Sequence, residues 1–60
     1  MITEMEIVEL MLGVQSKRWD PRQEVALLLQ VKLKNNLQDA AKEALDRRID
    51  VLRRIILSGP

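Results

Sequence analysis

The sequence contains no cysteine, histidine, tyrosine or phenylalanine, and its single aromatic residue is Trp19. Without cysteine the chain forms no disulfide and offers no thiolate ligand to a metal. Without histidine it lacks the imidazole that most often binds zinc and that most often serves as a catalytic acid or base. The sequence therefore predicts no bound metal and no cofactor, and it predicts that the protein is not an enzyme.

Neither sign of charge is in excess, and long apolar runs are missing. Ten Lys and Arg residues nearly balance nine Asp and Glu residues, which leaves a net charge of +1. The apolar segment 1–14 is interrupted by Glu4, Glu6 and Glu9 and no basic stretch precedes it, which argues against a signal peptide. The longest uncharged run elsewhere, residues 25–31, is far too short to span a bilayer. We therefore expect a cytoplasmic protein with no membrane partner.

The chain is short for its apolar content. It has 60 residues, of which 47% are hydrophobic. A chain of this length is marginally stable alone, and the usual supports are disulfides, a metal or association. Since the first two are excluded, the sequence predicts that residues 1–60 form a single small helical domain that assembles into a dimer or a higher oligomer.

Capping signals predict three helices, over residues 4–12, 21–34 and 37–57. Thr3 and Glu6 have the spacing of a capping box at the first start, and Gly13 is expected to end this helix in left-handed geometry. Asp20, Pro21 and Gln23 provide the same kind of start for the second helix. Gly59 and Pro60 are expected to end the third.

The boundary between the second and third helices has two interpretations. Asn35 and Asn36 fit a tight turn, because Asn tolerates left-handed geometry and caps helices well. One continuous helix would cost only about 1.3 kcal/mol for its two interior Asn residues. Its apolar face would rotate by roughly 100° between the two segments, however, which favours a break. The predicted fold class is therefore all-α, with a short N-terminal helix followed by an antiparallel helical hairpin that self-associates into a small helical bundle.

The apolar side chains of these helices form stripes. Met5, Val8 and Leu12 share one stripe of the first helix. The second helix is apolar on two sides, which predicts a central helix or one between subunits. Its broad face is expected to hold Val25, Ala26, Leu28, Leu29 and Leu33, and its opposite side Leu27 and Val31.

The second helix is too short to cover the whole of the third helix. The first helix is expected to fill the space beside the C-terminal third of the third helix. This arrangement predicts that Trp19 lies at the junction of all three helices. Because the cap at Asp20 and Pro21 fixes the backbone beside it, Trp19 has the rigid placement that an anchor for a partner needs.

Arg48 falls within the apolar half of the third helix, and its role has two interpretations. Its guanidinium either pairs with a carboxylate at a helix or subunit interface, where it would fix the register, or escapes to water while its stem packs. The second outcome, snorkelling, ranks slightly ahead on a face this wide.

These features favour a small non-enzymatic protein–protein interaction module, such as an adaptor, regulator or inhibitor. It would act as a homo-oligomer through its apolar helix faces and would bind another protein. The candidate interaction residues are Trp19, Arg22, Leu27, Val31, Arg48, Leu52, Ile55 and Ile56.

Two other functions remain open. The first is a nucleic-acid-associated accessory protein that uses Arg18, Arg22, Arg47, Arg48, Arg53 and Arg54. Asp46 and Asp50 alternate with these arginines and reduce the local field, and the chain lacks the excess positive charge that is typical of phosphate binding. The second is a small structural subunit of a larger assembly.

Overall fold

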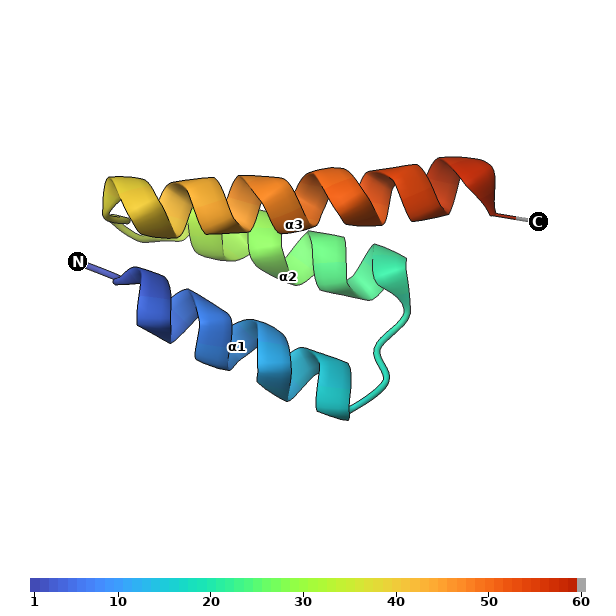
Figure 1. Ribbon diagram of the computed structural model, residues 1–60, viewed down its shortest axis with the longest axis horizontal. Helices are drawn as coiled ribbons and strands as arrows, with labels where there is room; N and C mark the ends of the chain where they lie inside the picture. The colour runs from blue at the N-terminus through green and yellow to red at the C-terminus, as the bar shows by residue number, and fades with distance from the viewer. Residues whose placement is uncertain (60) are drawn as a thin grey trace.

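The chain folds into three helices, α1 (Glu4–Ser16), α2 (Pro21–Lys34) and α3 (Asp39–Ser58). The computed structural model describes residues 1–59, so Pro60, part of the expected end signal, lies outside the described residues. Within residues 1–59 there is no strand, and an isolated bridge joins Ile2 and Leu37. The prediction of an all-α chain with an antiparallel α2–α3 hairpin is confirmed (Figure 1). None of the three helices within residues 1–59 contains an apolar stretch of the length that a membrane span requires.

The first two helices begin where their caps predict. The Thr3 hydroxyl oxygen accepts a hydrogen bond from the backbone N–H of Glu6, at 3.3 Å. Asp20 caps α2, because its Oδ1 accepts from the N–H of Arg22 at 2.9 Å and its own N–H donates to Gln23 Oε1 at 3.3 Å. These bonds satisfy N–H groups that have no partner within the helix. Local chemistry is therefore sufficient to place both starts.

Helix α1 is longer than predicted, because Gly13 lies inside it and does not end it. The residue with left-handed geometry is Arg18, whose φ is 56°. Continuing the helix to Ser16 buries Val14, which is 4% exposed. Burying a valine contributes about 1.5 kcal/mol or more, whereas a glycine inside a helix costs about 1 kcal/mol. Tertiary burial therefore outweighs the local stop signal.

The break between α2 and α3 is confirmed, although it is not a left-handed turn. Asn35 is extended, with φ −129° and ψ 151°, and its side-chain amide donates to the carbonyl of Val31 at 3.1 Å. The extended connection pairs with the N-terminal segment. The N–H of Ile2 donates to Asn36 O at 2.8 Å, and the N–H of Gln38 donates to Ile2 O at 3.0 Å. These two bonds tie the start of α1 to the start of α3.

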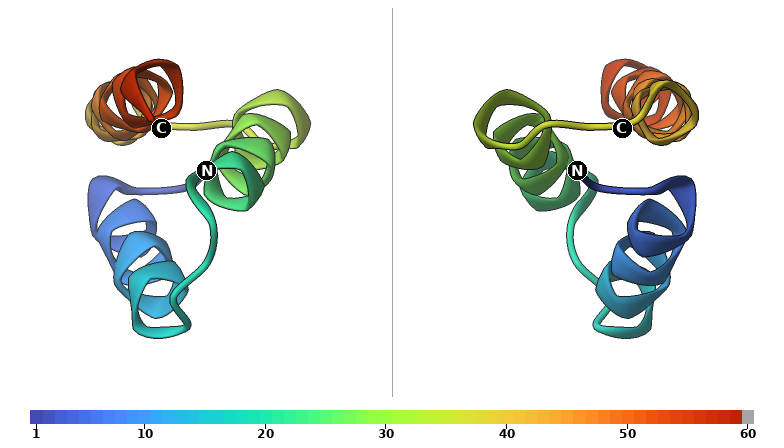
Figure 2. Two further views of the ribbon diagram at one scale, coloured as in Figure 1. Left: turned by 90° about the vertical axis from the view of Figure 1, so that its right-hand side faces the viewer. Right: turned by 90° about the vertical axis from the view of Figure 1, so that its left-hand side faces the viewer.

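The predicted position of α1 was wrong. Because Ile2 is held at the α2–α3 connection, α1 begins beside the start of α3 and runs in the same direction, and the end of α3 extends beyond it (Figure 1). Seen end-on, the three helices form the corners of a triangle, with α1 and α3 on one side and α2 on the other (Figure 2). The C-terminal part of α3 is therefore not the segment that α1 covers.

The core lies at the centre of this triangle. Its buried side chains come from all three helices: Ile7, Leu28, Ala41, Leu45, Ile49 and Leu52. On α2 the buried positions are Glu24 and Leu28, with Val31 packed against the core from the next turn. The predicted apolar face of α2 was therefore wrong in part, since Leu33 is 83% exposed. The prediction used hydrophobicity alone, and it misplaced the face because one of the positions of α2 that point into the core is Glu24.

Candidate protein interface

Apolar side chains remain exposed along the side of the molecule formed by α1 and α3. On α1 they are Met5, Val8 and Leu12, which follow one another at spacings of three and four residues. On α3 the exposed apolar residues of this side are Val51 and Ile55. A spacing of three and four places each set on one face of its helix. We call the surface made by these five residues the α1–α3 face.

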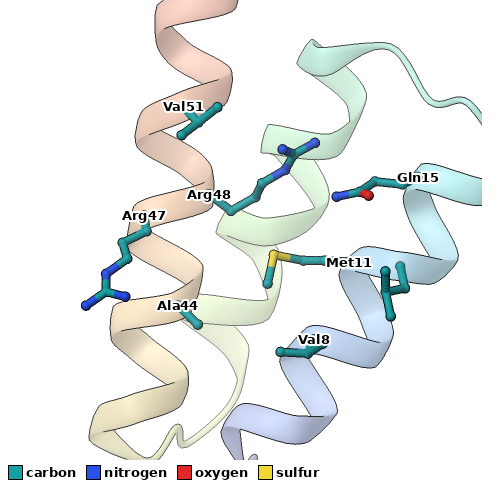
Figure 3. Close-up of a pocket in the computed structure, with 8 residues that line it drawn as sticks. Val8, Met11, Gln15, Ala44, Arg47, Arg48 and Val51 are labelled. Carbon is teal, nitrogen blue, oxygen red and sulfur yellow. The ribbon is translucent and has the colours of Figure 1, made fainter.

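A groove of about 390 Å³ runs between the two helices on this face (Figure 3). Its lining residues are Val8, Met11, Leu12, Gln15, Ala44, Arg47, Arg48 and Val51. Ala44 lies on the α3 side of the groove, and its short side chain leaves the space between the helices unfilled. The apolar residues of the lining outnumber the polar ones, so the groove resembles the apolar grooves into which helices bind.

Arg48 lies at this groove and joins α3 to α2. Its Nε donates to Glu24 Oε2 at 2.7 Å, and its Nη2 donates to Glu24 Oε1 at 3.2 Å. The Glu24 side chain is 4% exposed and that of Arg48 is 27% exposed. The favoured interpretation, in which Arg48 snorkels to water, was therefore wrong. The alternative was correct, because Arg48 pairs with Glu24 at the interface between α2 and α3.

The Glu24–Arg48 pair gives each of the two charged side chains a hydrogen-bonding partner of opposite charge. The pKa of the Arg48 guanidinium is raised above its ordinary value, mainly because it donates hydrogen bonds to Glu24 and also through Coulomb attraction, while desolvation acts in the opposite direction. Within residues 1–59 no buried side-chain nitrogen or oxygen lacks a partner. Two parallel hydrogen bonds between a guanidinium and a carboxylate demand one geometry. The pair therefore favours one register of α2 against α3.

Trp19 lies between α1 and α2, not at a junction of three helices. It borders a second hollow, of about 310 Å³, together with Leu10 and Val14 of α1 and Leu27 of α2. No residue of α3 lines this hollow. Trp19 is 38% exposed, so one part of the ring packs against the chain and another part contacts solvent.

The other predicted interaction residues are scattered over the fold. Arg22 is exposed at the start of α2, whereas Leu27 and Val31 are half-buried on that helix. Ile55 is exposed and Ile56 is half-buried near the end of α3. Leu52 packs in the core.

Two features of this side of the molecule were missed from the sequence. Val8, Leu12 and Val51 were not among the candidates, although the stripe of α1 was visible. For Val8 and Leu12 the signal that could have found them is a second apolar stripe on α1, offset from Ile7 and Val14. Val51 lies on α3, three residues after Arg48 and four before Ile55, and both of these neighbours were candidates. Glu24 was missed because its role depends on Arg48, which lies 24 positions away in the sequence.

Acidic neighbours pair with several of the cationic side chains. Arg54 donates to Asp50 at 2.9 Å, and Arg47 lies 4.0 Å from Glu43. Among residues 1–59 no three carboxylates are arranged to hold a metal ion.

Comparisons of the chain with protein-family models, with curated proteins and with solved structures return no match. The case for a site therefore rests on its geometry.

Proposed function

We propose that this protein is a non-enzymatic protein–protein interaction module that works through the α1–α3 face and self-associates there. The observation that carries the proposal is the exposure of Val8, Leu12 and Val51 around a groove of about 390 Å³. Contiguous exposed apolar surface on a small chain is typical of an interaction site. In a role as an adaptor, regulator or inhibitor, the other protein would bind either in place of the second copy or on surfaces that the second copy leaves exposed.

A nucleic-acid-associated role receives less support. Arg48 is committed to Glu24, and Arg54 is paired with Asp50. Binding a phosphate with these arginines would require breaking or sharing the existing pairs. The net charge of +1 also offers little of the long-range attraction that drives binding to nucleic acid.

The proposal is tested by placing a charge on the α1–α3 face. Leu12→Glu is expected to abolish self-association, because a carboxylate would be desolvated at the centre of the interface. The matched control is Leu33→Glu, since Leu33 is also an exposed leucine but lies on α2. Sedimentation velocity should give a mass near that of one chain, 7.0 kDa, for Leu12→Glu and a larger mass for the wild type and the control.

Two results would contradict the proposal. The first is a wild-type protein that sediments as a single chain at high micromolar concentration. The second is the reverse pattern, in which Leu33→Glu dissociates the assembly and Leu12→Glu does not. That pattern would place the interface on the outer side of α2. Circular dichroism of both variants verifies that a loss of association does not reflect unfolding.

A further inference from the structure

Both helices of the α1–α3 face are acidic where they begin and basic where they end. The first turns of α1 contain Glu4, Glu6 and Glu9, and Lys17 and Arg18 follow its last residue. In α3, residues 39–46 contain three acids and one lysine, a net charge of −2, whereas residues 47–58 contain four arginines and one aspartate, a net charge of +3. Each helix is therefore polarised along its axis.

The two polarities add instead of cancelling, because α1 and α3 run in the same direction (Figure 1). Helix α2 runs the opposite way, so Lys32 and Lys34 lie near the α2–α3 connection and Asp20 and Glu24 lie near the α1–α2 loop, but they do not reverse the polarity. Residues 1–9 and 31–46 contain six acids and three lysines, a net charge of −3, whereas residues 10–30 and 47–59 contain seven basic and three acidic residues, a net charge of +4. The end near the α2–α3 connection is therefore acidic, and the end near the α1–α2 loop is basic. The long axis of the molecule measures 37 Å, several times the Debye length of about 8 Å at physiological ionic strength. Each end therefore presents its own charge to an approaching molecule, even though the chain as a whole is nearly neutral.

This polarity distinguishes the two ways in which a second copy can stack on the α1–α3 face about a twofold axis. If the helices of the two copies run parallel, acidic ends meet acidic ends and basic ends meet basic ends. If they run antiparallel, each acidic end meets a basic end. In the antiparallel arrangement α1 lies over the partner's α1, and the first half of α3 lies over the second half of the partner's α3.

We propose that the occupant of the α1–α3 face is a second copy of this chain, packed antiparallel, so that the charges at both ends of the dimer are complementary. This inference rests on the proposed function and names the partner and its orientation. The side of the molecule that carries this face spans its two longer dimensions, 37 and 20 Å, which leaves room for the ~800 Å² that each partner buries in a stable complex. The three-and-four spacing of its apolar residues suits packing between nearly antiparallel helices.

Charge-exchange variants test the orientation. One variant carries Asp39→Lys and Glu43→Lys, which makes both halves of α3 basic. The other carries Arg53→Glu and Arg54→Glu, which makes both halves acidic. In an antiparallel dimer each variant alone brings like charges together at both ends, and we expect self-association to weaken by about tenfold or more at low salt. In an equimolar mixture unlike charges meet at both ends, so mixed dimers should form as readily as wild-type dimers.

Native mass spectrometry of each variant and of the mixture distinguishes these species by mass. Circular dichroism confirms that both variants are folded. If each variant alone dimerises as well as the wild type, or if the mixture does not form mixed dimers, the antiparallel arrangement is overturned, while the α1–α3 face stands as an interaction surface. If the wild type itself is a single chain, both this inference and the proposed function fail.

Discussion

The two sides of α3 that face other helices differ sharply. Toward α2 the contact is packed by Leu28, Leu45 and Ile49 and bridged by the Glu24–Arg48 pair, and we call it the closed side. A hollow of about 260 Å³ lies only at its outer edge, beside Leu29 and Lys32 of α2. Toward α1 the contact is closed at the start of the helices and opens into a groove further along. The comparison indicates that the two sides of α3 have different roles. The side toward α2 provides stability, and the side toward α1 provides the surface that we propose for binding.

Side-chain size accounts for the difference. The side of α3 that meets α2 carries Leu45 and Ile49, which are large enough to reach the facing helix. The side that meets α1 carries Ala41 and Ala44 in its first half. A methyl group lets the helices approach but leaves a hollow where they diverge. Figure 1 shows α1 and α3 diverging as α1 runs toward its C-terminal end, and the groove lies between them.

Arg48→Ala is the substitution that we expect to destabilise the α2–α3 contact most, because it leaves the buried Glu24 carboxylate unpaired. We expect it to lower the free energy of unfolding by about 3–5 kcal/mol. This corresponds to a melting temperature lower by about 12 °C or more. The control replaces both partners with leucine, and it should restore stability to within about 1 kcal/mol of the wild type because neither charge is then buried. Thermal melts decide the matter, and an Arg48→Ala variant that melts like the wild type would show that the pair does not lock the two helices.

Matched leucine truncations on the two sides sharpen the comparison. Leu28→Ala on the closed side should cost about 3 kcal/mol, because Leu28 is fully buried and its removal leaves a cavity. Leu12→Ala on the open side should change stability by less than about 1 kcal/mol at concentrations where the chain is dissociated, since Leu12 is 60% exposed. Chemical denaturation at low micromolar concentration measures both. Equal losses would show that the open side contributes as much to folding as the closed side.

Trp19 probes the third side of the triangle, between α1 and α2. Because its ring is only partly covered, Trp19→Ala should cost about 2 kcal/mol, less than the 3–5 kcal/mol of a fully buried aromatic residue. Its fluorescence maximum should lie at a shorter wavelength than that of free indole and should shift to longer wavelength on unfolding. A maximum that does not move on unfolding would show that the ring packs against nothing in the folded chain.

Gly13→Ala is the mildest change and has the opposite sign. Gly13 lies inside α1, and a Cβ atom added there would have no neighbour within 4 Å apart from its own helix and adjacent residues. Alanine should therefore raise stability by about 0.5–1 kcal/mol, because it restricts the unfolded chain and favours helix. The melting temperature should rise by a few degrees. A lower melting temperature would indicate that the helix needs the flexibility of glycine at this position.

The features that were predictable from the sequence are those set by near neighbours. The caps at Thr3 and Asp20 act within three residues, and they placed the starts of α1 and α2 correctly. The end of α1 was wrong because it depends on Val14 reaching the core, which is a tertiary event.

The candidate site was harder to predict for the same reason. Burial of Glu24 follows from a pairing with a residue 24 positions away, and no local pattern encodes it. The position of α1 depends on hydrogen bonds between Ile2 and the connection at residues 36–38. The apolar stripe of α1 was visible in the sequence, but its exposure became apparent only once the position of α1 against α3 was known.

The central claim, that the α1–α3 face contacts a second copy, is tested most directly by isotope-filtered nuclear Overhauser measurements on a mixture of labelled and unlabelled chains. The account predicts intermolecular contacts to the methyl groups of Val8, Leu12 and Val51. Contacts confined to Leu29 and Leu33 on the outer side of α2, or no intermolecular contact at millimolar concentration, would contradict it.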